Sequence, residues 1–166
     1  MAHGIVRTDK MFGTIVATGT ASAKYLPSDV ATEIDNGCFV VLGDYIIGER
    51  EVRKATTPAA NSAAVALVAS EEVDKTKKFD TLADFTNKAG SVLRCYVLHT
   101  GDEFSITADA FTKEDGVTPT VGTSILEAAA SVKGSLVNTP TASTTKIADL
   151  IAIEQDGPVT WYVFRV

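Results

Sequence analysis

Turn residues divide this chain of 166 residues into short β-prone segments and leave little continuous sequence for long helices. The segments are rich in Val, Ile, Thr and aromatic residues, which favour strands, and Gly, Pro or Asn-Gly breaks separate them. Residues 125–130 fit a strand or a helical turn equally well. The pattern predicts a mainly β protein, with strands at residues 14–18, 22–26, 49–56, 65–69, 94–100, 103–107, 147–154 and 159–166.

The strongest hairpin pattern lies between residues 30 and 42. Residues 30–34 alternate apolar and polar side chains, the period of a half-buried strand. Asn36-Gly37 follows, and this dipeptide accepts the positive φ angles of a tight turn. Residues 38–42 are a short apolar run. The segment therefore predicts two antiparallel strands joined at Asn36-Gly37.

The last segment, residues 159–166, is apolar on both faces. Trp161 and Val163 share one face with the stem of Arg165, and Tyr162 and Phe164 occupy the other. A strand with one solvated face would alternate apolar and polar residues, so this strand is expected to be covered on both sides.

One helix is predicted, over residues 81–89. Asp80 or Thr81 can cap its first amides, Leu82 and Phe85 share a face, and Gly90 stands at the left-handed C-cap position. With a charged connection before it, this helix divides the chain into an N-terminal arm (1–12), an N-terminal β lobe (13–73), a linker with the short helix (74–92) and a C-terminal β lobe (93–166).

Charge and composition argue against several classes of partner. The chain carries 15 Lys and Arg against 21 Asp and Glu, a formal net charge of −6. No basic stripe that could follow phosphates is visible, so neither nucleic acid nor an anionic membrane is an expected partner. The N-terminus lacks the apolar region of a secretory signal. Two Cys and two His are too few for a typical structural zinc site, and we expect Cys38 and Cys95 to be buried free thiols.

A catalytic site is not expected. His99 could in principle work with Asp102 and with Cys95 or Ser105. However, Cys95 and His99 stand two positions apart on one face of a strand, roughly 13 Å between α-carbons, too far for a nucleophile and its base. The carboxylates form no distinctive pair. We therefore predict no catalytic, cofactor-binding or metal-binding residues.

An interaction role fits the arm better. Its β-prone residues have no local partner, and such a segment can add to a neighbouring sheet through backbone hydrogen bonds. The arm residues expected to contact a partner are Ile5, Val6, Arg7, Met11 and Phe12.

The chain resembles the head decoration, or auxiliary capsid, proteins of tailed bacteriophages. The opening GIVRTDKMFGT is similar to the start of that family, as are the middle run YVLHTGDEFSIT (96–107) and the close from Ile147 to Glu154 with Trp161-Tyr162-Val163. Two further similar stretches are Glu33 to Gly37, followed by Phe39-Val40-Val41, and Gly48 to Val52. Together these places span most of the chain.

The resemblance implies a non-enzymatic structural protein without cofactors. Such proteins are made in the bacterial cytoplasm, bind the outside of the expanded capsid as trimers or monomers, and clamp adjacent major capsid subunits. Short strands at regular spacing also predict a β-barrel or β-tulip-like C-terminal lobe. Two alternatives stay open: another virion component, such as a tail-tube, head-completion or fibre-base protein, and a small hydrolase or lyase that uses His99 with an acidic partner.

Overall fold

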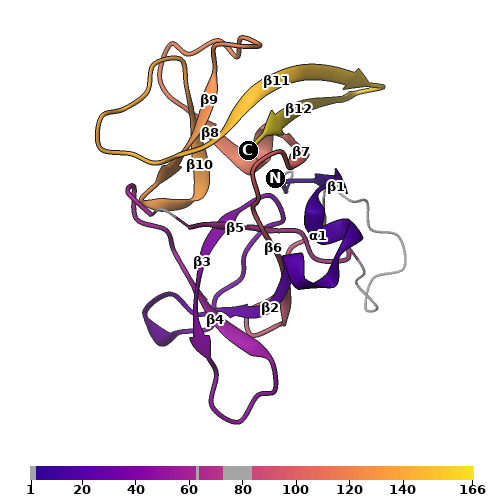
Figure 1. Cartoon of the computed structure of the whole chain (residues 1–166), viewed down its shortest axis with the longest axis vertical. Helices are drawn as coiled ribbons and strands as arrows, with labels where there is room; N and C mark the ends of the chain where they lie inside the picture. Colours follow the sequence, from indigo (N-terminus) through magenta and orange to yellow (C-terminus); the bar gives the residue numbers. More distant parts are fainter. Residues whose placement is uncertain (1–2, 63, 73–83) are drawn as a thin grey trace.

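The computed structural model describes residues 3–62, 64–72 and 84–166. Within them the protein is mainly β, as predicted, and combines a closed five-stranded barrel, a curled seven-stranded sheet and one α-helix (Figure 1). Helix α1 spans Phe12–Ile15, and 3-10 turns cover Ala17–Gly19, Pro27–Asp29 and Ala108–Ala110. The strands are β1 Val6–Lys10, β2 Thr20–Tyr25, β3 Phe39–Tyr45, β4 Val52–Thr56, β5 Ala66–Val68, β6 Leu93–Val97, β7 Glu103–Thr107, β8 Phe111–Lys113, β9 Ile125–Ala129, β10 Ser131–Val137, β11 Lys146–Asp156 and β12 Val159–Arg165.

The first lobe is the closed barrel, with strand order β2-β4-β3-β5-β6. A cluster of buried side chains takes members from all five strands and therefore fills the barrel interior; it includes Val40, Val68, Cys38 and Cys95. Because side chains alternate across a strand, the neighbours of these residues point outward. The barrel thus presents a second apolar surface on its outside.

The second lobe is the sheet with strand order β1-β7-β12-β11-β9-β10-β8. Its inner face carries Phe104, Leu126 and Phe164, which are at most 1% exposed. Phe39 and Leu67 from the outside of the barrel join this same cluster, and the rings of Phe39 and Phe104 lie 6.1 Å apart. One of the two hydrophobic clusters therefore spans both lobes.

Strand β12 is covered on both sides, as its sequence predicts. Phe164 is fully buried on the inner face, while Trp161 and Val163 are 5% and 8% exposed on the outer face. Strands β7 and β11 flank it on either edge.

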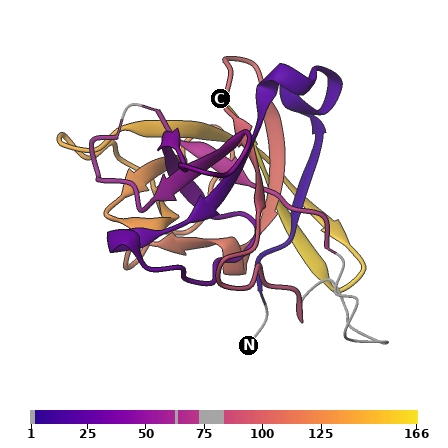
Figure 2. The same cartoon turned by 90° about the horizontal axis from the view of Figure 1, so that it is seen from below.

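The predicted lobe boundaries differ from the observed ones at two strands. β6 lies in the predicted C-terminal lobe, yet it pairs with β2 and β5 and closes the first barrel. β1 lies in the predicted arm, yet it pairs antiparallel with β7, and Figure 2 shows it running alongside β7 before the chain turns into α1. The arm is thus received by its own chain, and this pairing gives the backbone groups of β1 hydrogen-bond partners along one side.

The hairpin predicted over residues 30–42 is wrong. β3 begins at Phe39, but residues 30–33 form no strand and Val30 is 63% exposed. Asn36 instead uses its side-chain amide as a backbone mimic: its Oδ1 accepts the N–H of Ser70 and its Nδ2 donates to the carbonyl of Ser70, both at 3.0 Å. The turn at Gly37, with φ +82°, therefore leads β3 toward β5.

The helix predicted over residues 81–89 is also wrong in its described part. Residues 81–83 lie outside the described residues, and residues 85–89 form no helix. Asn87 exchanges two backbone hydrogen bonds with Ile34, each 3.0 Å long. Two helical turns are marginal without packing, so these tertiary bonds prevail over local propensity. The helix occurs instead at α1, where residues 14–18 had predicted a strand.

Candidate functional site

The N-terminal segment forms an edge of the seven-stranded sheet. Val6 pairs with Ile106 and Arg7 with Ser105 of β7. Before the strand, the N–H of Ile5 donates to Oγ1 of Thr107 over 3.2 Å. Ile5, Val6 and Arg7 are all half-buried, so only part of each predicted contact residue faces solvent.

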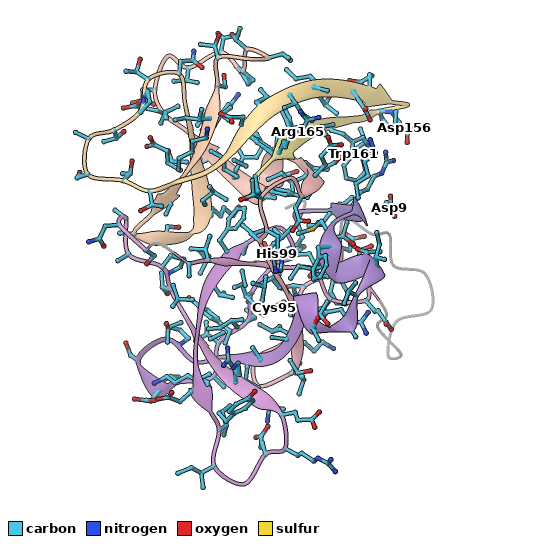
Figure 3. All side chains as sticks on the ribbon, in the orientation of Figure 1. Asp9, Cys95, His99, Asp156, Trp161 and Arg165 are labelled. Atoms are coloured by element: carbon cyan, nitrogen blue, oxygen red, sulfur yellow. The ribbon has the colours of Figure 1, made fainter. Side chains whose placement is uncertain are left out.

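Arg7 is held on the outer face of the sheet by two contacts. Its guanidinium carbon lies 3.8 Å from the centroid of the Trp161 ring, and its Nη2 lies 2.7 Å from Oδ2 of Asp156. Figure 3 shows Trp161 and Asp156 on the β11–β12 side of the molecule, with Asp9 nearby. A guanidinium stacked on an aromatic ring and paired with a carboxylate fixes the position of β1 more than it offers a free charge.

The same outer face carries a ladder of opposite charges. Glu103 accepts hydrogen bonds from Arg165 (Nε, 3.0 Å) and from Lys10 (Nζ, 3.2 Å). These hydrogen bonds, that of Arg165 first, lower the pKa of the Glu103 carboxyl below its usual value. The ladder therefore ties the end of β1 to β7 and β12.

After β1 the chain makes the short helix α1 and exposes an apolar surface. Phe12, Ile15 and Val16 are 41%, 81% and 37% exposed, and we call these three residues the α1 patch. Met11, just before the helix, is fully buried in the shared core. Met11 therefore anchors the segment and is not available to a partner, which corrects its predicted role.

Two glycines allow this tight reversal. A Cβ on Gly13 would lie 2.8 Å from the carbonyl oxygen of Gly19, and a Cβ on Gly19 would lie 2.6 Å from the Cα of Gly13. The two backbones can approach only because neither residue has a side chain.

Asp102 fixes the start of α1. Its side chain is buried, and its two oxygens accept the backbone N–H of Phe12 at 2.7 Å and that of His99 at 2.9 Å. The His99 ring in turn lies 4.7 Å from the Phe12 ring. The α1 patch thus sits on a specified backbone, and Asp102 is the residue that sequence reasoning considered only as a catalytic partner.

The catalytic arrangement around His99 gains no support from the geometry. Nδ1 of His99 lies 3.8 Å from Oδ2 of Asp102, beyond hydrogen-bond distance, and its closer neighbour is the carbonyl of Val97 at 2.9 Å. Burial raises the pKa of the Cys95 thiol to about 12, so this sulfur is protonated at neutral pH. His99 and Asp102 act here as packing and hydrogen-bonding groups.

The structure also exposes two apolar residues that the sequence reasoning did not single out. Ile15 and Val16 belong to a run whose β-prone composition predicted a strand, so their exposure beside a helical turn was not expected.

Over residues 3–62, 64–72 and 84–166, no group of three or more His, Cys, Asp or Glu side chains is placed to hold a metal ion. Among the same described residues, no helix has the length and apolarity needed to cross a membrane.

Comparison of the chain with protein-family models, with curated proteins and with solved structures finds no match in any of the three.

Proposed function

We propose that the protein is a structural virion component that binds the outer surface of a bacteriophage capsid and stabilises the mature shell by clamping adjacent major capsid subunits. The observation that carries the proposal is the α1 patch, where large apolar side chains stand in solvent on a rigidly anchored turn. Exposed apolar patches of this kind are typical of protein–protein interaction sites. The resemblance of the sequence to head decoration proteins supplies the partner.

The anchoring of the patch supports a binding role. Met11 in the core and Asp102 at the helix start hold α1 in one conformation before any partner arrives. A preorganised surface loses less conformational entropy on association and so binds more tightly for the same contact area. A protein that binds only the expanded lattice would stabilise that lattice by mass action.

The proposal is tested by sedimentation with expanded capsid shells that lack this protein. Wild-type protein should co-sediment in a fixed ratio to the major capsid protein. Ile15→Ser should weaken binding roughly tenfold or more, since it removes an apolar side chain from the interface. Val121→Ser is the matched control, because Val121 is also exposed but lies in the connection between β8 and β9 of the second lobe.

Point substitutions are preferable to removing residues 1–12. Such a truncation would delete Met11 from the core and β1 from the sheet, and would thus lose stability together with any contact. Failure of wild-type protein to bind the shells would contradict the proposal. A closed ring of defined copy number formed by the purified protein would instead favour a tail-tube or head-completion component.

A further inference from the structure

A second exposed apolar site, separate from the α1 patch, lies at the apex of the β3–β4 hairpin. β3 and β4 pair antiparallel, with Val41 opposite Thr56 and Tyr45 opposite Arg53. Figure 1 shows this hairpin projecting at the lower end of the molecule, away from the β11–β12 hairpin. At its apex Ile47 is 101% exposed, and Tyr45 beside it is 62% exposed.

The apex has one specified conformation. The N–H of Ile46 donates to the carbonyl of Val52 over 2.8 Å, and that of Glu49 donates to the carbonyl of Ile46 over 3.1 Å. Gly48 and Glu51 adopt φ angles of +87° and +61°. A left-handed conformation at a non-glycine residue such as Glu51 persists only where its surroundings determine it.

Side chains brace the apex from both sides. Nζ of Lys24 lies 2.5 Å from Oε1 of Glu49, and the guanidinium of Arg53 lies 5.0 Å from the centroid of the Tyr45 ring. These contacts hold the apex that carries Ile47 in one position. The exposed Ile47 side chain contributes no burial free energy to the stability of the isolated protein, but it would contribute to binding if it entered a matching apolar pocket.

The charges near the apex indicate what such a pocket belongs to. Asp44, Glu49 and Glu51 lie near the apex together with Arg50, Arg53 and Lys24, so the two signs of charge balance there. Loops that dock on anionic lipid need an excess of basic residues, so a membrane is disfavoured. An apolar centre with a polar rim of mixed charge matches the anatomy of a protein–protein contact.

From this arrangement we infer that the β3–β4 hairpin is a second docking point, at which Ile47 inserts into an apolar pocket of a capsid shell subunit. The inference rests on the proposed function and names a further contact for it. α1 and the hairpin apex lie at different places on the molecule (Figure 1), so the two points can reach different subunits. Two linked contacts give an avidity that neither provides alone, which is what clamping requires.

The first test measures binding of Ile47→Ser to the same expanded shells. Because Ile47 is fully exposed, the substitution should leave thermal stability unchanged. Its dissociation constant should rise by about 10- to 100-fold relative to wild type, while the control Val121→Ser, at another exposed apolar position, should bind as wild type does. Wild-type affinity of Ile47→Ser would overturn the inference, and loss of binding by Ile15→Ser alone would leave the proposed function standing. If wild-type protein fails to bind, the proposed function itself fails.

The second test locates the apex directly. Cys38 and Cys95 are buried, so Ile47→Cys supplies a single accessible thiol for a photoactivatable cross-linker. Illumination with shells should join the protein to the major capsid protein, and the same label at Val121→Cys should not. Cross-linked dimers of this protein without shells, or flotation of wild-type but not Ile47→Ser protein with phosphatidylglycerol vesicles, would overturn the inference in favour of self-association or lipid.

Discussion

At the residue scale, Asp102 joins two segments of the chain, although it lies in the turn between β6 and β7. Its carboxylate accepts one backbone N–H from each of two segments, the start of α1 and the start of the β6–β7 connection. Replacing it with a side chain that cannot accept hydrogen bonds would leave both partly buried donors without this partner. The α1 patch therefore depends on a residue that need not touch the partner.

Asp102→Ala should lower the free energy of unfolding by about 2–4 kcal/mol, because it removes two hydrogen bonds to a charged group, each worth about 1.5–3 kcal/mol before the donors regain water. Urea unfolding followed by circular dichroism measures the change. Asp109→Ala is the control, since Asp109 is an exposed carboxylate, and it should stay within about 0.5 kcal/mol of wild type. Equal stability of the two variants would show that the Asp102 contacts are not stabilising.

The buried thiols give a second prediction at this scale. Burial raises the pKa of both Cys38 and Cys95 from 9.0 to about 12. Below pH 9 both states hold the thiol protonated and its contribution to stability is complete. Between pH 9 and 12 the unfolded chain releases the proton first, so stability falls as pH rises, by up to about 1.4 kcal/mol per pH unit for each thiol.

Urea unfolding at pH 8, 9 and 10 should therefore show a steeper loss of stability for wild type than for the Cys38→Ala/Cys95→Ala variant. In the native protein neither thiol should react with a disulfide reagent at pH 8, and both should react in denaturant. Parallel pH profiles for the two proteins would rule out the thiols as the cause.

At the element scale, the loop over residues 138–145 is tied to β9 by one buried carboxylate. Glu127 is 2% exposed, and its oxygens accept the N–H of Thr141 at 2.9 Å and the hydroxyl of Thr144 at 2.6 Å. The following residue, Thr145, donates its N–H to the carbonyl of Ala60 in the barrel lobe. One side chain thus positions a loop that bridges the two lobes.

Glu127→Ala should destabilise the protein by about 2–4 kcal/mol, since it removes two hydrogen bonds to a charged group. It should also speed amide hydrogen exchange at Thr141 and Thr145 more than elsewhere. The exposed Glu154→Ala serves as the control. If exchange rises evenly over all strands, Glu127 contributes to overall stability and not to the loop in particular.

Sequence reasoning predicted well those strands that their own local hydrophobic pattern defines. β5, β7, β11 and β12 follow from short apolar or alternating runs bounded by turns. The hairpin over residues 30–42 and the helix over residues 81–89 failed for one shared reason: Asn36 and Asn87 are committed to tertiary hydrogen bonds with Ser70 and Ile34. Such bonds join residues far apart in the sequence and leave no local pattern.

The candidate site shows the same limit. The β-prone N-terminal segment predicted a partner contact, which stays a prediction, and Phe12 of this segment is exposed. It could not indicate that Met11 turns inward while Ile15 turns outward, because this depends on the Gly13–Gly19 approach that reverses the chain. Exposure is set here by backbone geometry more than by residue type.

At the scale of the whole molecule, the lobes meet where small residues pack closely. A Cβ on Gly37 would lie 2.5 Å from the Cβ of Ala110, and a Cβ on Gly4 would lie 2.8 Å from the same atom. Gly37 belongs to the barrel lobe, Ala110 to the second lobe, and Gly4 to the segment between them. The lobes can approach this closely only while these positions stay small.

Gly37→Ala should therefore destabilise the protein more than Gly116→Ala. Both glycines have similar positive φ angles, +82° and +79°, but a Cβ on Gly116 meets nothing within 4 Å. The control thus carries the backbone strain alone, about 1 kcal/mol, and the difference between the variants measures the clash at the lobe junction. Scanning calorimetry should show one cooperative transition for wild type. Equal melting temperatures for the two variants would contradict close packing at the junction.

The pairing of β1 with β7 also bears on how the chain reaches its native state. Val6 is synthesised well before its partner Ile106 and before the neighbouring strand β12, which pairs with the other edge of β7. Contacts between such distant residues require closure of a large loop, and proteins rich in them fold slowly. Because α1 directly follows β1 and is held by Asp102, we expect the α1 patch to take its final position only once this long-range pairing has formed.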